Sequence, residues 1–153
     1  MAILSEFTGT WAGTNGFRLM PADPLAGFPA SATVTVAAGG HLTTVTYAWE
    51  HPDDGPQEGL IVIGAGGEDD SLVATWGDSW HQKPVPMSLS GRRGAEGGFV
   101  LDGSYGEGWG WRIVFEAGSG KELRMRMDNV LPEEYATREV SVYPVMIMEL
   151  GRV

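Results

Sequence analysis

Apolar and polar residues alternate along most of this chain, and clusters of turn-forming residues separate the alternating runs. Successive side chains of a strand point to opposite faces, so this pattern predicts strands that each bury one face. Helical periodicity is nearly absent. The ten predicted strands lie at about Gly9–Gly16, Ala32–Ala37, Leu42–Glu50, Gln57–Ile63, Leu72–Trp76, Met87–Gly91, Phe99–Tyr105, Trp111–Glu116, Glu122–Asn129 and Arg138–Leu150.

Strands this short, at near-regular spacing, predict an all-β fold in which hairpins join neighbouring strands. Such a sheet leaves two unpaired edges unless it closes on itself. We therefore expect residues 1–153 to form a single domain, an antiparallel β-barrel of about ten strands. The length suits one domain, and the 23 glycines concentrate in the connections, where turns need them.

The connection Leu19–Pro29 is longer than a hairpin turn and contains three prolines beside large apolar residues. Long loops in compact domains are often functional. Two interpretations stay open for it. It is either a lid over one mouth of the barrel, with Leu25 and Phe28 facing inward, or a proline-stiffened crossing of the surface.

The chain carries a formal net charge of −10 and contains no cysteine. Phosphate backbones and anionic membrane surfaces attract clustered Lys and Arg, so neither nucleic acid nor a membrane is an expected partner. No apolar run approaches the roughly 18 residues of a membrane helix, and the N-terminus lacks the features of a secretory signal. These observations favour a cytoplasmic protein.

Short motifs recur in a fixed order along the chain. The opening Gly9-Thr10-Trp11 resembles the Gly-x-Trp signature of the calycins, which include lipocalins and fatty-acid-binding proteins. The ordered set is similar to a bacterial calycin-like family whose function is not established. The motifs after the opening are Tyr47-Ala48-Trp49, Gln57-Glu58-Gly59, Asp78-Ser79-Trp80-His81, Gly110-Trp111-Arg112 and Met127-Asp128-Asn129.

The resemblance implies a calycin-like antiparallel barrel of eight to ten strands around an internal cavity. It also implies that Trp11 closes one end of the barrel beneath an arginine, with Arg112, Arg138 and Arg152 as the candidates. Nitrobindin-type haem barrels, which the chain resembles faintly, bind iron through a histidine near the C-terminus. No histidine follows His81 here, so we expect no haem and no other cofactor.

Two aromatic groups mark the candidate site. In regular strands Trp76, Asp78 and Trp80 share one face, and Trp109 and Trp111 share one face of another strand. Aromatic walls with a few fixed polar groups are typical of small-molecule sites, and the same residues also suit a closed core. The residues expected to bind a ligand are Tyr47, Trp49, Trp76, Asp78, Trp80, His81, Trp111, Arg112, Met125 and Met127.

Five polar side chains are expected inside the barrel or at its mouth: Glu58, Asp78, His81, Arg112 and Asn129. We expect Asp78 and Arg112 to pair, because a buried carboxylate needs a partner. His81 is the one candidate for a general acid or base near the aromatic groups. A lone histidine is, however, more often a structural group held by hydrogen bonds.

Spacing argues against two other kinds of site. Ser79 and His81 lie about 6.6 Å apart along a strand, whereas a nucleophile and its base need roughly 2.6–3.2 Å. His41 and His51 lie roughly 33 Å apart in an extended chain, so they do not share a metal ion. We expect no metal site.

Three functions remain open at this point. The leading hypothesis is binding of a small hydrophobic or amphipathic molecule inside the barrel, without catalysis. The first alternative is an isomerase, cyclase or lyase that uses His81 with Asp78 and Arg112. The second alternative is a structural module with a filled barrel. A homodimer is compatible with all three.

Overall fold

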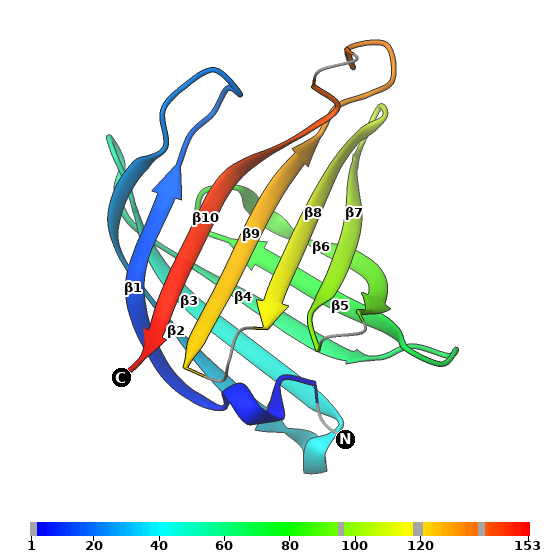
Figure 1. The fold of residues 1–153 in the computed structure, drawn as a ribbon. Helices are drawn as coiled ribbons and strands as arrows, with labels where there is room; N and C mark the ends of the chain where they lie inside the picture. The colour runs from blue at the N-terminus through cyan, green and yellow to red at the C-terminus, as the bar shows by residue number, and fades with distance from the viewer. Residues whose placement is uncertain (1–2, 95–96, 118–120, 138–139) are drawn as a thin grey trace.

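The strands follow one another in sequence order around a closed antiparallel sheet (Figure 1). The computed structural model describes residues 3–94, 97–117, 121–137 and 140–153, and no helix within these ranges is long and apolar enough to cross a membrane. This architecture confirms the expected all-β fold, a single antiparallel barrel. Its strands are β1 (Gly9–Phe17), β2 (Ala26–Ala37), β3 (Leu42–His51), β4 (Gly55–Ala65), β5 (Ser71–Asp78), β6 (Gln82–Arg93), β7 (Phe99–Gly106), β8 (Trp109–Ala117), β9 (Glu122–Val130) and β10 (Val142–Arg152).

Each of the ten predicted strands overlaps a strand of the structure, and most of the observed strands are longer. β2 begins at Ala26 rather than Ala32, because Phe28 continues the inward-facing alternation toward the start of the strand. The predicted start of the last strand, Arg138, lies outside the described residues, and β10 begins at Val142. Strand existence was therefore easier to predict than strand ends.

The N-terminal segment closes the end of the barrel at which β10 ends (Figure 1). It contains the 3₁₀ turn η1 (Ser5–Phe7), which packs Phe7 against Trp11 with the ring centroids 5.7 Å apart. The indole N–H of Trp11 donates to the carbonyl oxygen of Phe7 at 2.8 Å. The Trp11 side chain is 0% exposed, so it is a fully buried plug at this end.

The arginine beside this plug is Arg152, whose guanidinium carbon lies 4.4 Å from the centre of the Trp11 ring. Arg152 also donates to two backbone carbonyls of the N-terminal segment. Of the other two candidates, Arg112 lies on the outer surface of β8 and Arg138 lies outside the described residues. A cation–π contact of this kind contributes about 0.5–2 kcal/mol.

Inward-facing side chains from all ten strands form one contiguous core. Met125 and Met127 of β9, which the sequence suggested as a ligand wall, are 2% and 0% exposed within it. Methionine fills irregular gaps in cores because its side chain is unbranched and flexible. These two residues therefore pack the barrel interior.

The connection Leu19–Pro29 divides into an exposed loop and the start of β2. Met20 and Leu25 are 59% and 38% exposed, so the expectation that Leu25 faces inward is wrong. Phe28 is partly buried and lies on the inward side of β2. The Arg18 guanidinium donates to carbonyls of the loop and of β10, which fixes the loop at the surface. Of the two interpretations, the proline-stiffened crossing of the surface fits most of this segment.

Replacing Trp11 by alanine is expected to lower the free energy of unfolding by about 3–5 kcal/mol, because a buried large aromatic leaves a cavity. Tyr135→Ala is the control, since Tyr135 is 58% exposed and its truncation should cost less than about 1 kcal/mol. Urea titrations of both variants measure the difference. Equal unfolding midpoints for wild type and Trp11→Ala would show that this end of the barrel does not depend on the plug.

Candidate functional site

The carboxylate of Asp78, 4% exposed at the end of β5, organises one end of the barrel. Its Oδ2 accepts hydrogen bonds from the Tyr47 hydroxyl at 2.6 Å and from the Trp49 indole at 3.2 Å. Its Oδ1 accepts the backbone N–H groups of Trp80 at 2.7 Å and His81 at 2.9 Å. Both carboxylate oxygens are therefore satisfied by neutral donors.

Tyr47 extends this network into the core. Its hydroxyl accepts the indole N–H of Trp76 at 2.9 Å while it donates to Asp78. Burial, reinforced by the Asp78 carboxylate, raises the pKa of the Tyr47 phenol well above its ordinary value, so the hydroxyl stays protonated. Gly59 of β4 makes room for the ring, because a Cβ atom there would lie 2.2 Å from the Tyr47 hydroxyl oxygen.

The connection between β5 and β6 turns His81 inward. The register of the two strands shifts just before Asp78, and the carboxylate caps the two backbone N–H groups that follow Ser79. Aspartate often stabilises turns in this way. In a straight strand His81 would face away from Asp78, but the turn brings it into the aromatic cluster. The exposed Ser79 hydroxyl instead donates to a β4 side chain.

Arg112 does not pair with Asp78, so the predicted ion pair is wrong. Its Nε donates to Oδ1 of Asp102 at 2.7 Å on the outer surface, and its side chain is 36% exposed. The reason is the period of a strand. Trp111 and Arg112 are consecutive residues of β8, so when Trp111 faces the interior, Arg112 faces outward.

His81 lies within a cluster of indole rings. Its ring stacks on that of Trp49, with centroids 5.2 Å apart and planes inclined by 19°. The Trp111 ring lies 5.1 Å from His81 and stacks almost parallel on Trp76, with centroids 5.2 Å apart and planes inclined by 6°. Offset-stacked and tilted arrangements at these distances are favourable for aromatic pairs. The cluster therefore joins the core to the open end of the barrel.

A cavity of about 260 Å³, called the mouth cavity below, lies at the end of the barrel opposite the Trp11 plug. The connection after β1, the β5–β6 turn and the β7–β8 hairpin all contribute to it, and Figure 1 shows the first and last of these at the same end. The lining residues are Arg18, Leu19, Trp80, His81, Tyr105, Trp109, Trp111, Asn129 and Val145.

Three predicted ligand residues, Trp80, His81 and Trp111, line the mouth cavity, and Trp109 joins them from the face that it shares with Trp111. Arg112 lies outside the barrel. The others belong to the packed core and do not line this cavity. These six predicted residues, each 0–4% exposed, are Tyr47, Trp49, Trp76, Asp78, Met125 and Met127.

Sequence reasoning missed four residues of the cavity wall: Arg18, Leu19, Tyr105 and Val145. Tyr105 is 44% exposed and lies at a register shift between β7 and β8, so alternation along β7 does not predict its place in the wall. Val145 sits where the β9–β10 register shifts, and a bulge leaves no signature in alternation. Asn129 was expected at the mouth and lies there, whereas Glu58 is exposed on the outer surface.

Two buried ring N–H groups have no acceptor among the described residues. The first is the indole N–H of Trp111, and the second is Nε2 of His51. Because Nδ1 of His51 accepts the backbone N–H groups of Asp53 and Asp54, both at 3.0 Å, its Nε2 carries the proton in the neutral ring. A buried donor without an acceptor costs about 1–3 kcal/mol. Of the two rings, that of Trp111 lines the mouth cavity.

His81 is an uncharged group in this wall. Burial lowers the pKa of its imidazole to about 4, although the nearby Asp78 carboxylate acts in the opposite direction. His51 contributes a small further lowering of this pKa. The imidazole Nε2 lies 2.9 Å from Sδ of Met146. Sulfur is a weak acceptor, so this contact favours the tautomer that is protonated on Nε2.

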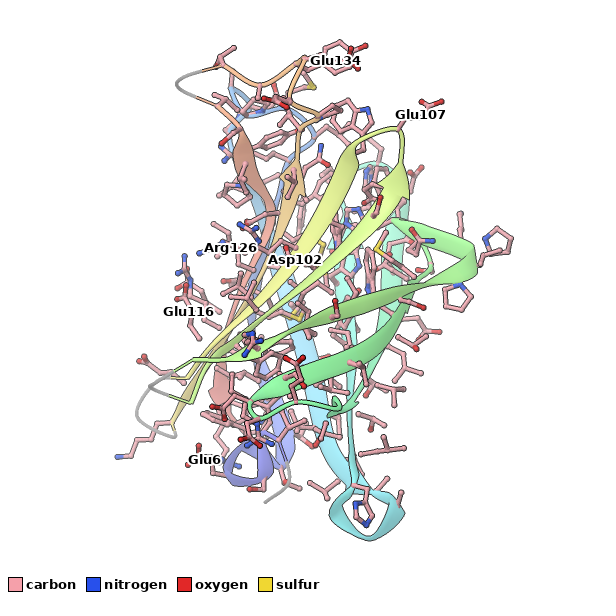
Figure 2. All side chains as sticks on the ribbon, turned by 90° about the vertical axis from the view of Figure 1, so that its right-hand side faces the viewer. Glu6, Asp102, Glu107, Glu116, Arg126 and Glu134 are labelled. Carbon is pink, nitrogen blue, oxygen red and sulfur yellow. The ribbon has the colours of Figure 1, made fainter. Side chains whose placement is uncertain are left out.

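The rim of the mouth cavity is aromatic and acidic. Trp109 stacks on the exposed ring of Tyr135, with centroids 6.0 Å apart and planes inclined by 28°. Figure 2 places Glu107 and Glu134 at this end of the barrel and Glu6 at the opposite end. In the described ranges, no group of three or more His, Asp or Glu side chains is placed to hold a metal ion. The rings at the rim and in the wall can stack, and the polar groups beside them can form hydrogen bonds.

Comparison of the chain with protein-family models gave no match, and a search of curated proteins gave none either. The site is therefore interpreted from its own geometry.

Asp78→Asn is expected to destabilise the fold by about 2–4 kcal/mol, because the amide NH₂ group would face donors that now bind a carboxylate oxygen. Asp102→Asn is the matched control. Asp102 is paired but half exposed, so its neutralisation should change stability by less than about 1 kcal/mol. Chemical denaturation measures both effects. Equal effects of the two substitutions would contradict the role assigned to Asp78.

The lowered pKa of His81 makes stability depend on pH. Between about 4 and 6.5 the unfolded chain binds more protons at this residue than the folded one, so its contribution is lost as pH falls through that range. The slope approaches about 1.4 kcal/mol per pH unit. The free energy of unfolding should therefore be lower at about pH 5 than at about pH 7, and His81→Gln should remove the share of this difference that comes from His81. Asp78 and His51 are present in both proteins, so an unchanged difference would overturn the assignment.

Proposed function

We propose that the protein binds a small, planar, largely apolar molecule in the mouth cavity. The observation that carries this proposal is an aromatic cavity wall that includes Trp111, whose buried indole N–H has no acceptor among the described residues. Ligand sites are typically concave and apolar, with a small number of placed polar groups. The wall of the mouth cavity combines aromatic rings with polar groups from Arg18, His81 and Asn129.

Its dimensions limit the size of the ligand. Pockets for drug-sized molecules usually measure roughly 300–1,000 Å³, and this one measures about 260 Å³. Rings from Trp80, Trp109 and Trp111 contribute flat surfaces to its wall, and such surfaces bind planar rings through stacking. A bicyclic aromatic molecule suits both the volume and the walls.

The polar groups favour a neutral ligand with a hydrogen-bond acceptor. The Trp111 N–H can only donate, and the His81 ring is uncharged at neutral pH. The guanidinium of Arg18 already donates to backbone carbonyls, and the chain as a whole is acidic. A carbonyl or ring nitrogen is therefore a better match for this wall than a carboxylate.

The calycin resemblance is consistent with this proposal. A closed antiparallel barrel with a buried tryptophan beside an arginine at one end is the arrangement that the resemblance implies. The packed core, however, restricts the proposed ligand to the mouth. The filled-barrel alternative thus suits the part of the barrel toward the Trp11 plug, and ligand binding is proposed for the end with the mouth cavity.

Proton-transfer catalysis by His81 is less well supported. The imidazole lines the cavity, as a catalytic group would, but a pKa of about 4 makes it a weak base at neutral pH. Asp78 binds the backbone N–H of His81, and Arg112 lies outside the barrel. The expected trio of groups is therefore not assembled, and binding without catalysis is the function that the geometry supports best.

Calorimetric titration with quinoline and naphthol tests the proposal. We expect at least one of them to bind, and Trp111→Phe to weaken its binding about tenfold, because the ring remains while one hydrogen bond is lost. Trp11→Phe is the control, since Trp11 lies at the opposite end and its replacement should leave the affinity unchanged. No binding by any probe below about 1 mM, or equal losses in both variants, would refute the mouth cavity as a ligand site.

A further inference from the structure

The outer surface of the barrel is divided into two chemically different faces. Over the middle of β2 to β6, the outward-facing side chains are short, apolar or hydroxylated, and none is charged; this region is called the neutral face. Leu60 and Val73 are 42% and 50% exposed on it. Glu50 and Glu58 lie toward one end of it, and Glu68, Asp69 and Asp70 lie in the β4–β5 connection at the other end. The neutral face includes Thr33, Thr46, Leu60, Val73, Thr75 and Ser88.

The opposite outer face, over β7 to β9, carries charges that are paired with one another. Glu116 accepts from Arg124 at 2.7 Å and from Arg126 at 3.1 Å, and Arg126 also binds Asp128. Figure 2 shows Glu116, Arg126 and Asp102 on this side of the molecule. Glu116, Arg124 and Arg126 are partly exposed and Asp128 is buried, and their charges are satisfied by one another. This face therefore needs no partner to neutralise them.

The neutral face is hollowed and is flanked by a projection. A groove of about 760 Å³ runs over it. Its lining includes Leu60 and Thr75, the carboxylate of Glu58 at one end, and the buried Asp78, whose oxygens are already hydrogen-bonded within the chain. On one side lies the segment of β6 around Val85, which leaves the regular pairing with β5. Trp76 pairs with Met87 and the next pair is Asp78 with Gln82, so the β6 residues between Gln82 and Met87 have no regular partner in β5. Val85 is 68% exposed there. One chain thus presents both an apolar projection and an apolar groove.

We propose that the neutral face binds a second copy of this chain, with Val85 of each copy seated in the groove of the other. A two-fold dimer uses the same surface on both partners, and a projection beside a groove satisfies that requirement. Each copy carries a net charge of −10, so two copies repel one another except where carboxylates are absent. The middle of the neutral face, around Leu60 and Val73, is such a place.

Other occupants match this surface less well. A basic partner would be drawn to the carboxylates elsewhere on the chain rather than to this face. A standard interface covers roughly 800 Å² of each partner, about a tenth of the 8354 Å² surface of this chain. A face that extends over five of the ten strands is large enough for that.

Sedimentation equilibrium of the full chain tests the dimer. At about 100 µM we expect a mass near that of two chains, with dimerisation strengthened as NaCl rises from about 0.01 to about 1 M because salt screens the repulsion between copies. An interface built on the ion pairs of the opposite face would weaken with salt. A mass of one chain at every salt concentration, or dissociation by salt, would overturn the proposal.

Variants locate the interface. Leu60→Glu and Val85→Asp should each weaken dimerisation at least tenfold, because each buries a carboxylate against a second acidic chain. Val100→Glu is the matched control, since Val100 is similarly exposed, at 37%, but lies on β7 outside the neutral face. Circular dichroism confirms that each variant is folded. Loss of the dimer in Val100→Glu, or an intact dimer in both Leu60→Glu and Val85→Asp, would place the interface elsewhere.

Discussion

The buried carboxylate of Asp78 is the constraint on which the open end of the barrel depends. A charge removed from water must be satisfied by hydrogen bonds, and here the donors come from two neighbouring aromatic side chains and from the turn that follows. The same group therefore fixes Tyr47 and Trp49 in the core and positions Trp80 and His81 at the mouth. Without it, neither the turn nor the aromatic cluster would be held in one arrangement.

The two ends of the barrel differ because they meet different requirements. At one end Trp11, the N-terminal segment and Arg152 seal the core. The Trp11 indole N–H donates to a backbone carbonyl, and the Arg152 guanidinium lies over the Trp11 ring and donates to a backbone carbonyl of the same segment. At the other end the rings are packed, but the indole N–H of Trp111 has no acceptor within the part of the chain that the structure describes. Both ends therefore contribute to stability, and recognition is proposed for the open end.

Much of the fold could be predicted from the sequence because it depends on local signals. Alternation predicts the strands, and glycine clusters predict the turns. The resemblance carried by the short Gly-x-Trp motif implies an arginine beside Trp11. The site was harder, because its geometry depends on departures from regular strands. The register shift before Asp78 and the turn after it bring His81 inward, where a straight strand would turn it away from Asp78. Arg112 faces outward because it follows the inward-facing Trp111 in β8, which prevents the expected pair with Asp78.

The most direct test of the central claim is an NMR titration of the six indole N–H resonances with quinoline. If the mouth cavity is the binding site and the Trp111 N–H is its free donor, the Trp111 signal should move downfield and saturate. The signals of Trp80 and Trp109 should shift with it, and that of Trp11 should stay in place. A titration in which Trp111 stays unchanged, or in which Trp11 shifts as far as Trp111, would contradict the account.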